Sequence, residues 1–535
     1  MRSSARFDLL PLEPSVVLWG PPGVGKSTVA RLLAAALGRP LVDTDELVTT
    51  RANRSIETIF RTDGEPTFRA LEREAVRDAL AGAPSVLAVG GGALVDPGLR
   101  GEVLRRALVV RLDAPFGTLR ERITSSGSRP LLSEPPDALE RLLEARSEAY
   151  RSGHLAVDAT AAPEVVAELV LQRVRSGVIP LSMPPHAYGA FLAEGEAQAV
   201  LSTLLAGAKP SSVHAVVDAS VHSLFGAELL EGLSVRPRSV HLVAPGERAK
   251  TFPELERVTG ELLEAGIDRN SVVIALGGGA TTDLAGLAAA LLARGVRWIA
   301  APTTLLSMVD ASVGGKTAIN HGPIKNPIGA FHHPLAVVVD PTLTASEPER
   351  GFRSALAELA KTALVGDPIL FELLEGDPGS FLARSQRTLR DAIFRALRVK
   401  ASVVTADPEE HGVRAILNLG HTVGHAIEAD AAGSVLHGEA VAMGIEAALE
   451  LGRERGVTDP ALQGRVVRVL RSLELPSLAP LSPGALSRLR FDKKRRGTSV
   501  QLVLVRAVGS AELVGCSLDE LAASVRKLGV VASVS

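Results

Sequence analysis

The chain has 535 residues and nearly equal numbers of basic and acidic side chains, 58 against 60, so no global field points to nucleic acid or to an anionic membrane. Its length exceeds what one hydrophobic core supports and predicts about three domains. Because there is no long apolar run, no signal-peptide core at the start and only one cysteine, Cys516, we expect a soluble cytoplasmic protein without disulfides.

The first strand pattern, residues 15–19, runs directly into GPPGVGKST and then into an apolar helical pattern. This order of strand, glycine loop and helix gives meaning to the motif G-x-x-x-x-G-K-[ST], in which backbone N–H groups wrap phosphates. Lys26 would reach the β- and γ-phosphates, and Ser27 would hold Mg²⁺. The predicted nucleotide loop consists of Gly20, Gly23, Gly25, Lys26, Ser27 and Thr28.

Acidic and basic side chains recur through the rest of the first third. The strand pattern PLVDTDELV contains Asp43 and Asp45 at the edge of a parallel sheet where ligands bind, although both could simply cap a helix. Arginines then occur before and after a glycine run; alone, they would be read as solvated surface residues. The residues concerned are Arg69, Gly90, Gly91, Gly92, Arg122, Arg129 and Arg146.

In this order the motifs resemble the shikimate kinase family, from residue 14 to about residue 174. The resemblance implies a P-loop domain over residues 1–177, with helices on both faces of a parallel sheet, that phosphorylates shikimate with ATP and Mg²⁺. It implies that Asp43 and Ser27 organise Mg²⁺, and that Asp45, Lys26 and Arg129 are catalytic, with Asp45 as the base. The implied contacts to the shikimate carboxylate, the ring hydroxyls and adenine are Arg69 with Arg146, Gly90 to Gly92, and Arg122.

A boundary follows the kinase-like part. Pro180, Pro184 and Pro185 disfavour helix and predict a linker or a first strand near residues 176–186, between two independent folding units. Short buried strand patterns at 213–218, 239–244 and 271–276 then alternate with helical ones, which predicts a parallel α/β sheet. The last of these strands enters GGGATTD, an arrangement that suits a pyrophosphate, although tight-turn packing would require the same glycines.

Beyond residue 346 amphipathic helical patterns dominate and predict a helical domain. Three histidines, His421, His425 and His437, lie close together there. His421 and His425 are four apart and would project from one helix face towards a zinc-type ion, although the pair could equally cap and pack a helix. Glu358 and Lys361 are three apart and share a face, as an ordinary intrahelical ion pair also does.

The run RGVRWIAAPTTLLSMVDASVGGKTAINHGPIKNPIGAF at 294–331, together with these helical motifs and DKKRRG near residue 492, resembles 3-dehydroquinate synthase over about residues 210–515. The resemblance implies cyclisation of 3-deoxy-D-arabino-heptulosonate 7-phosphate to 3-dehydroquinate with phosphate release, dependent on NAD and on Zn²⁺ or Co²⁺. It implies a Rossmann-like NAD-binding α/β domain at 178–345, an all-helical metal- and substrate-binding domain at 346–535, and a homodimer formed through this part.

The same resemblance assigns the metal to Glu358, His421 and His437 and leaves His425 for the substrate. NAD would contact Glu247, Lys250, Gly277, Gly278, Gly279, Asp283, Thr303, Thr304, Asp310, Lys325 and Asn326. The substrate would contact Arg294, Lys316, Lys361, Lys400, Arg414, Asn418, His425 and one of Lys493 and Lys494. Of these, Lys316, Lys361 and His425 would be catalytic. An anionic substrate with a carboxylate and a phosphate explains so basic a lining.

One residue departs from the synthase pattern: Thr282 stands where the family usually has glycine, and its β-branched side chain would tighten the approach to the pyrophosphate. We therefore expect a fusion of two small-molecule enzymes that act at non-adjacent steps of the shikimate pathway, without direct transfer of product. Two alternatives stay open. The synthase part could be a related sugar-phosphate cyclase, or the P-loop part could be a non-catalytic, nucleotide-binding regulatory domain.

Overall fold

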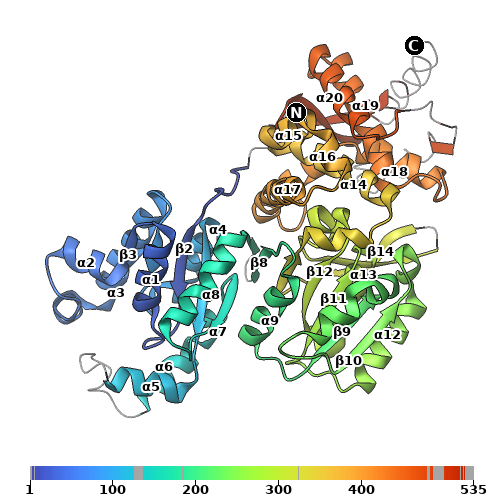
Figure 1. The fold of residues 1–535 in the computed structure, drawn as a ribbon. Coiled ribbons are helices and arrows are strands. Elements are labelled where there is room, and N and C mark those ends of the chain that lie inside the picture. The colour runs from blue at the N-terminus through green and yellow to red at the C-terminus, as the bar shows by residue number, and fades with distance from the viewer. Residues whose placement is uncertain are drawn as a thin grey trace.

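The computed structural model describes residues 3–4, 7–125, 137–183, 186–322, 324–478, 482, 484–485, 499–517, 520–521 and 523. The predicted site residues Arg129, Lys493 and Lys494 lie outside these ranges. Figure 1 shows a sheet flanked by helices at the N-terminal end, a second and larger sheet, and a mainly helical region above it. No helix among the described residues is long and apolar enough to cross a membrane.

The first sheet is parallel, with the strand order β3-β4-β2-β5-β6, and has helices on both faces (Figure 1). Its central strand β2 is buried along its whole length, as the apolar run SVVLW predicts. Its strands are β2 (Ser15–Trp19), β3 (Leu41–Asp43), β4 (Val86–Ala88), β5 (Ala107–Asp113) and β6 (Leu155–Asp158). Its helices are α1 (Lys26–Leu37), α2 (Thr44–Ala52), α3 (Ile56–Ala81), α4 (Pro97–Arg106), α5 (Phe116–Ser125), α6 (Ala138–Ala145), α7 (Ser147–Tyr150) and α8 (Pro163–Ser176).

The second sheet has the order β10-β9-β11-β12-β15-β8-β7 and is parallel except for the edge pair β7 and β8. All three strands predicted for this region are present, as β9, β10 and β11. The strands are β7 (Val178–Met183), β8 (His186–Leu192), β9 (Val213–Asp218), β10 (Ser239–Val243), β11 (Val272–Gly277), β12 (Arg297–Pro302) and β15 (Ala336–Val339). The helices are α9 (Ala197–Ala208), α10 (Ala219–Val221), α11 (Ala227–Glu231), α12 (Phe252–Glu264) and α13 (Gly279–Leu291), and a separate hairpin consists of β13 (Lys316–His321) and β14 (Ile324–Phe331).

The region after residue 346 is helical as predicted, with one correction to the expectation that it is all-helical. It contains an antiparallel hairpin, β16 (Ser499–Ala507) and β17 (Ser510–Ser517), which β1 (Ser3–Ser4) extends to three strands. The sequence SVQLVLVRA contains a short apolar run at residues 502–505 that is rich in valine, which is typical of a buried strand. The helices are α14 (Glu349–Gly366), α15 (Pro368–Gly376), α16 (Pro378–Leu382), α17 (Gln386–Ala406), α18 (His421–Asp430), α19 (His437–Glu454) and α20 (Pro460–Ser472).

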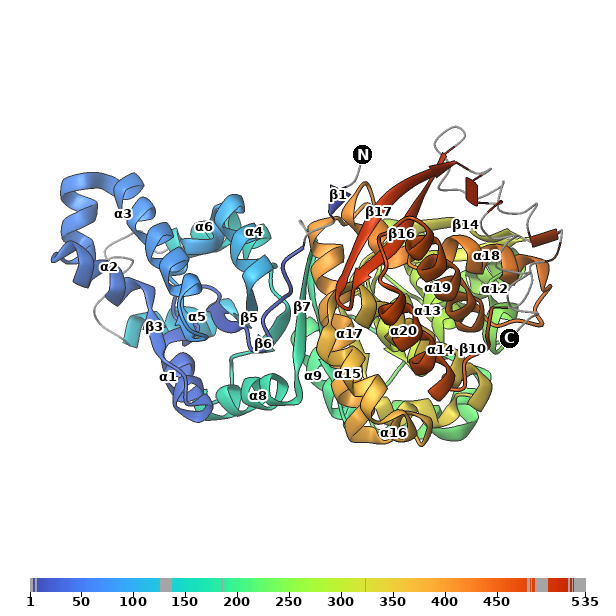
Figure 2. The same cartoon turned by 90° about the horizontal axis from the view of Figure 1, so that it is seen from above.

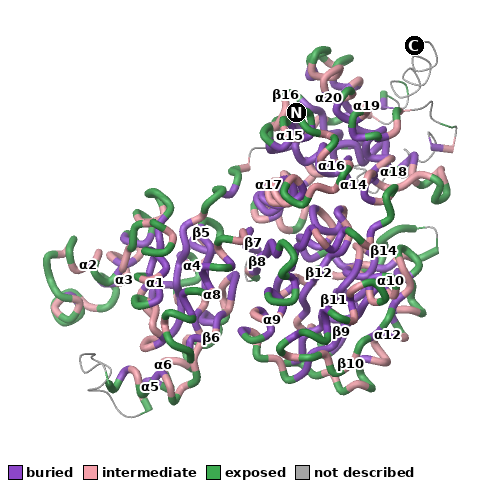
Figure 3. Tube along the Cα trace, viewed as in Figure 1, coloured by how far each residue is buried: buried purple, intermediate pink, exposed green. Residues whose placement is uncertain are grey.

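The predicted joint forms the edge strand β7. Because β7 has a neighbouring strand on one side only, Pro180 can lack its backbone N–H there without breaking a hydrogen bond in the middle of the sheet. Across it the two halves are closely packed. A Cβ on Gly207 of α9 would lie 2.1 Å from the carbonyl oxygen of Ala156 on β6, and one apolar core runs from Leu18 to Leu205 and beyond. Figure 3 shows the strands of both sheets buried beneath more exposed helices. The prediction that the two halves fold independently stays a prediction.

Candidate active sites

The first candidate site lies at the carboxyl edge of the first sheet, around the loop between β2 and α1. Gly20, Gly23 and Gly25 have φ angles of 148°, 80° and 101°, a backbone region that side-chain-bearing residues rarely adopt. Lys26 Nζ donates to the carbonyl oxygens of Gly20 and Pro21 at 2.9 and 3.0 Å, and Thr28 follows in the exposed first turn of α1. The loop therefore directs backbone and ammonium donors to the N-terminus of a helix.

The carboxylate of Asp43 links this loop to the next strand. Its Oδ2 accepts from Ser27 Oγ at 2.8 Å, and its Oδ1 accepts from the backbone N–H of Asp45 at 3.0 Å, which makes Asp43 the N-cap of α2. Asp45 lies exposed in the first turn of that helix. Asp43 therefore caps α2 with one carboxylate oxygen and contacts Ser27 with the other, so capping does not exclude a role at the nucleotide loop.

The basic residues converge on the glycine run that follows β4. A Cβ on Gly92 would lie 2.4 Å from Arg69 Nη2, and a Cβ on Gly90 would lie 3.1 Å from Asp45 Oδ1. Arg146 Nη1 donates to Gly91 O at 3.4 Å. Residues from α2, α3, α6–α7 and the β4 loop therefore meet in one place, with glycines where side chains would fill it.

Glu72 belongs to this cluster and was missed by the sequence analysis. It is 1% exposed, its Oε2 pairs with Arg69 Nη1 at 2.7 Å, and its Oε1 has no hydrogen-bond partner within the described part of the chain. Burial raises the pKa of Glu72, although Arg69 opposes the shift. The only sequence signal was its spacing, three residues after Arg69 on a helix.

Arg122 lies beside the nucleotide loop. Its guanidinium donates to Ala159 O at 2.9 Å, Thr160 O at 3.3 Å and Val24 O at 3.4 Å. It therefore bridges α5, the segment after β6 and the loop itself. Its predicted stacking on adenine stays a prediction.

The second candidate site contains a buried carboxylate among histidines. Glu358 on α14 is 1% exposed, and its Oε1 lies 3.6 Å from Nε2 of His421 on α18 and 3.6 Å from Nε2 of His437 on α19. Donor atoms bound at about 2 Å around a tetrahedral ion are about 3.3 Å apart, so these three atoms are spaced as ligands of one ion. Glu358 Oε1 has no hydrogen-bond partner among the described residues, which a bound cation would supply.

Outer contacts fix the rings of both histidines. His421 Nδ1 contacts Leu419 O at 3.1 Å, and His437 Nδ1 contacts Glu428 Oε2 at 3.1 Å, so that each Nε2 is left for a ligand. Burial opposes protonation of His437, but the carboxylates of Glu358 and Glu428 outweigh it and raise its pKa to about 10. The same negative charge favours a metal cation at this point.

His425 lies one turn after His421, more exposed than the other two histidines. Nitrogen atoms of His421, His425 and His437 all lie within 4.8 Å of one another. The predicted His421/His425 pair and the set that includes Glu358 therefore surround the same point. Glu358, His421 and His437 thus fit the ligand set of a divalent ion, and the remaining side of the ion would face His425.

Two buried lysines lie beside this cluster, Lys361 and Lys400. Lys361, 2% exposed, pairs with Glu358 Oε2 at 2.5 Å, and Lys400 Nζ donates to Asp310 O at 2.6 Å. Burial lowers the pKa of Lys400 to about 8 despite its pairing with Asp310. By contrast Glu358 and Asp310 raise the pKa of Lys361 against the effect of burial.

A second acidic residue, Glu410, was also missed by the sequence analysis. It pairs with Lys316 of β13, and its Oε1 accepts from Asn418 Nδ2 at 3.1 Å. Arg414, buried nearby, donates to Pro408 O, and a Cβ on Gly314 would lie 2.7 Å from Arg414 Nη2. Lys316, Arg414 and Asn418 are therefore brought together by one loop before α18.

The predicted NAD residues gather at the carboxyl edge of the second sheet. The glycine loop Gly277–Gly279 ends β11 and starts α13, with Gly278 as the N-cap, and Thr303 and Thr304 lie against it. Lys250 Nζ bridges Asp283 Oδ2 at 2.6 Å and Asn326 Oδ1 at 2.5 Å. Burial raises the pKa of Asp283 to about 6 although Lys250 opposes the shift.

Other predicted NAD residues complete the group. Glu247 accepts from Asn320 Nδ2 at 2.7 Å, and Lys325 on the β13–β14 hairpin pairs with Glu428 at 2.5 Å. Asp310 lies between Lys400 and the loop, and Lys400 together with Lys361 lowers the pKa of Asp310 to about 2 against the effect of burial.

Arg294 lies at the other end of α13 from the glycine loop. It follows the C-terminal end of this 13-residue helix, whereas the glycine loop lies at its N-terminal end, about 20 Å away. Its side chain is exposed, and no hydrogen bond or ion pair among the described residues joins it to Lys400 or Arg414. Its predicted contact with the substrate stays a prediction.

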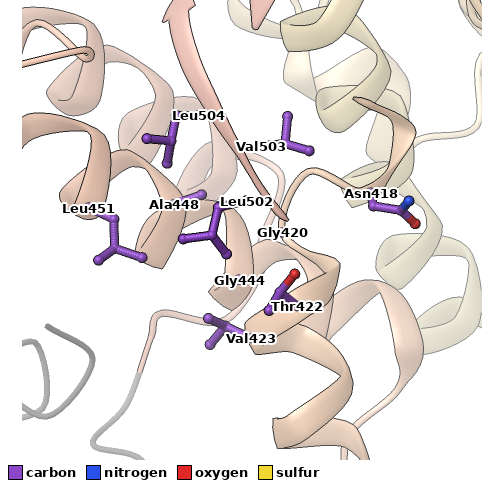
Figure 4. Close-up of a pocket in the computed structure, with 10 residues that line it drawn as sticks. All are labelled: Asn418, Gly420, Thr422, Val423, Gly444, Ala448, Leu451, Leu502, Val503 and Leu504. Carbon is purple, nitrogen blue, oxygen red and sulfur yellow. The ribbon is translucent and has the colours of Figure 1, made fainter. Parts of the chain in front are cut away.

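A small pocket lies behind α18, between that helix, α19 and β16 (Figure 4). It has room for about one water molecule, at about 10 Å³, and is lined on one side by Asn418 and Thr422 and on the other by Leu502, Val503 and Leu504. A substrate of sugar size does not fit there, so the pocket is a packing defect behind α18.

Family models match the chain in three segments. They are described as "Shikimate kinase", over residues 22–175, "3-dehydroquinate synthase N-terminal", over residues 240–354, and "3-dehydroquinate synthase C-terminal", over residues 355–495. The matched ranges contain both candidate sites.

Relatives of known name resemble the second part. A 3-dehydroquinate synthase of Acidithiobacillus ferrooxidans is 44% identical over 308 residues, which are 57% of this chain and 85% of that protein. One from Halorhodospira halophila is 43% identical over 304 residues, 56% of this chain and 85% of that protein.

The solved structure of a 2-epi-5-epi-valiolone synthase from Streptomyces hygroscopicus, with NAD⁺ and Zn²⁺ bound, is 30% identical with a TM-score of 0.59. It matches 65% of this chain and 99% of that one. A 2-deoxy-scyllo-inosose synthase with NAD⁺ and Co²⁺ has the same TM-score at 23% identity and shares the fold.

Proposed function

We propose the residue roles below on one premise: the chain belongs to the 3-dehydroquinate synthase family and carries a shikimate kinase domain before it. It is a bifunctional enzyme of the shikimate pathway, with both activities in one chain. The domain limits 1–177, 178–345 and 346–535 and the individual residue roles are our proposal.

In the kinase site the loop N–H groups and Lys26 hold the ATP phosphates, while Ser27 and Asp43 would hold Mg²⁺. Arg69 and Arg146 clamp the shikimate carboxylate, and Glu72 fixes the Arg69 guanidinium at 2.7 Å. Asp45 accepts the proton of the hydroxyl whose oxygen bonds to the γ-phosphorus as ADP leaves. The meeting of these groups with Gly90–Gly92 supports transfer rather than regulatory binding.

In the synthase site Glu358, His421 and His437 would hold the divalent ion, and the Gly277–Gly279 loop with Lys250 and Asp283 would hold NAD. When bound, these cofactors supply a Lewis acid and a reversible hydride acceptor. Lys361, Lys400 and Arg414 bind the substrate carboxylate and phosphate and replace their water shell with fixed charges. His425, on the open side, contacts the substrate.

The single observation that carries the synthase proposal is the position of Glu358 Oε1, buried, without a hydrogen-bond partner among the described residues and 3.6 Å from two histidine nitrogens. A cation held between this oxygen and the two histidine nitrogens would satisfy the buried carboxylate. The adjacent buried lysines give the anionic substrate a place beside the metal.

Homodimerisation and a cytoplasmic location complete the proposal. We infer that a second copy presents Arg294 to the substrate, because Arg294 is exposed and the nearby Leu291 is 59% exposed, as an apolar contact surface requires. Co-expression of Arg294→Ala chains with His437→Ala chains should restore cyclisation in the mixed dimer. A reduced, buried Cys516 suits the cytoplasm.

The test is a pair of assays on the purified chain: ATP-dependent phosphorylation of shikimate, and NAD- and zinc-dependent phosphate release from the heptulosonate phosphate. Each is repeated with Lys26→Ala and with His437→Ala. We expect each substitution to abolish only its own activity. Phosphate release without shikimate phosphorylation would contradict the kinase assignment. Turnover of a keto-sugar phosphate that lacks the carboxylate, in place of the acid, would favour a different cyclase.

A further inference from the structure

Residues 3–4 and 7–10 lie on the synthase half, away from the kinase sheet. Ser3 and Ser4 pair antiparallel with Leu513 and Glu512 of β17, and residues 7–10 continue along the helical region. We call residues 3–4 and 7–10 the N-terminal strap. Only residues 11–14 separate it from β2, and Figure 2 shows the crossing from the kinase sheet to the hairpin β16–β17.

The backbone of Leu10 is bound on both sides by α17. Its N–H donates to Ser402 Oγ at 2.9 Å, and its carbonyl oxygen accepts from Arg398 Nε and Nη2 at 2.9 and 2.7 Å. Leu10, Arg398 and Ser402 are 8%, 7% and 4% exposed. A buried guanidinium directed at one carbonyl is a specific, charge-assisted contact.

Phe7 packs where α14 and α17 cross. A Cβ on Gly366 of α14 would lie 3.0 Å from Phe7 Cζ and 2.8 Å from Val399 Cγ1 of α17. The strap thus contacts both helices at a point where they touch each other.

These two helices carry lysines of the synthase site. Arg398 and Ser402 are four residues apart and share one face of α17, whereas Lys400 is two residues from each and points to the other face, towards Asp310. Lys361 and Glu358 lie on α14. The strap therefore supports the outer side of a helix pair whose inner side lines the site.

We propose that the strap positions α14 and α17 for the synthase reaction, so that the N-terminal end of the kinase half sets the spacing of Lys361 and Lys400. The inference rests on the proposed substrate-binding roles of these lysines. The strap residues touch no substrate and act only through the two helices.

The test uses the full chain with Phe7→Ala and, as a matched control, Leu9→Ala, because Leu9 is 38% exposed in the same segment. We expect Phe7→Ala to raise the synthase KM for the heptulosonate phosphate roughly tenfold with a smaller change in kcat, since a displaced lysine binds the anion less well. Kinase constants, measured on the same sample, should not change, and Leu9→Ala should resemble the parent.

A second arm separates positioning from folding. A chain without residues 1–10 should show the same raised KM, and an excess of a peptide of residues 1–12 should restore the parent value. Loss of both activities together, equal effects of Phe7→Ala and Leu9→Ala, or no response to the peptide would overturn the proposal. Cyclisation by the parent chain is measured first, so an unchanged KM in Phe7→Ala counts against the strap and not against the proposed function.

Discussion

The two sites differ in how their charged groups are held. In the kinase site the groups come from loops and helix ends of one sheet, and Asp45 and Ser27 are exposed. In the synthase site Glu358 and Lys361 are 1% and 2% exposed, and pairs such as Lys325–Glu428 join the NAD-binding sheet to the helical region. Exposed charges of the first site such as Asp45 can therefore change with little structural cost, whereas buried charges such as Glu358 in the second site, and Glu72 in the first, also hold the fold together.

The largest expected effect is that of Glu358→Gln. Loss of this ligand should lower synthase activity by at least roughly a thousandfold, because several kcal/mol of Lewis-acid stabilisation are lost. It also leaves Lys361 buried without its partner, at a cost of about 3–5 kcal/mol in the unfolding free energy. Assays of both activities and a denaturant titration check this result, and normal stability would contradict the structural half of the comparison.

Asp45→Asn is the matching substitution in the kinase site. Removal of the base should lower the kinase kcat by about 10²–10⁴. Because Asp45 is exposed, the unfolding free energy should change by less than about 0.5 kcal/mol. Synthase kinetics serve as the internal control. A large loss of stability here would show that the two sites do not differ as argued.

Glu428→Gln tests the outer contact of the metal site. The amide should hold the His437 ring less firmly and cancel the pairing with Lys325, so that zinc affinity falls about 10–100-fold. Competition with a chromophoric chelator measures the affinity independently of turnover. Glu439→Gln, in the first turn of α19 but paired with Arg350, is the control and should bind zinc as the parent does.

The ease of prediction follows the same contrast. The nucleotide loop could be predicted from consecutive residues, because strand, glycines and Lys26 are neighbours in the chain. The proposed metal set could not be derived from spacing, which pointed to His421 and His425, because Glu358 comes from a third helix and only tertiary packing places its oxygen beside the histidines. Resemblance to a family supplied that residue.

Other features carried no usable signal. Glu410 and Glu428 pair with basic residues distant in the sequence, and Glu72 pairs with one on the neighbouring helical turn, whereas an acidic residue on a helix is ordinarily solvated. The strap was missed because Phe7 and Leu10 make sense only against Gly366 and α17, several hundred residues later. The hairpin β16–β17 was missed although β16 contains a short apolar run typical of a buried strand.

The pH dependence of the synthase should reflect Lys400. Burial lowers the pKa of Lys400 from 10.5 to about 8, so the side chain is charged below pH 8 and neutral above it. Since the charged form binds the anionic substrate, kcat/KM should fall as the pH rises through 8, by up to about tenfold per unit. Arginine stays charged, so Lys400→Arg should remove this alkaline limb. An identical limb in the variant would assign it to another group.

The smallest effect is expected for Thr282→Gly. Thr282 is 1% exposed, and its Oγ1 donates to Gly279 O at 3.1 Å within α13, so the side chain packs inside the protein and not against the glycine loop's open side. The KM for NAD should change less than about threefold, while a glycine inside a helix costs about 1 kcal/mol of stability. Gly278→Ala is the contrast: its Cβ would meet Thr304 Cγ2 at 3.1 Å at the N-cap, and it should raise the KM for NAD more. A KM for NAD that falls more than about tenfold in Thr282→Gly would mean that the β-branched residue does hold the pyrophosphate away. The conformation of the Gly277–Gly279 loop would then depend on the side chains packed behind it as well as on its glycines.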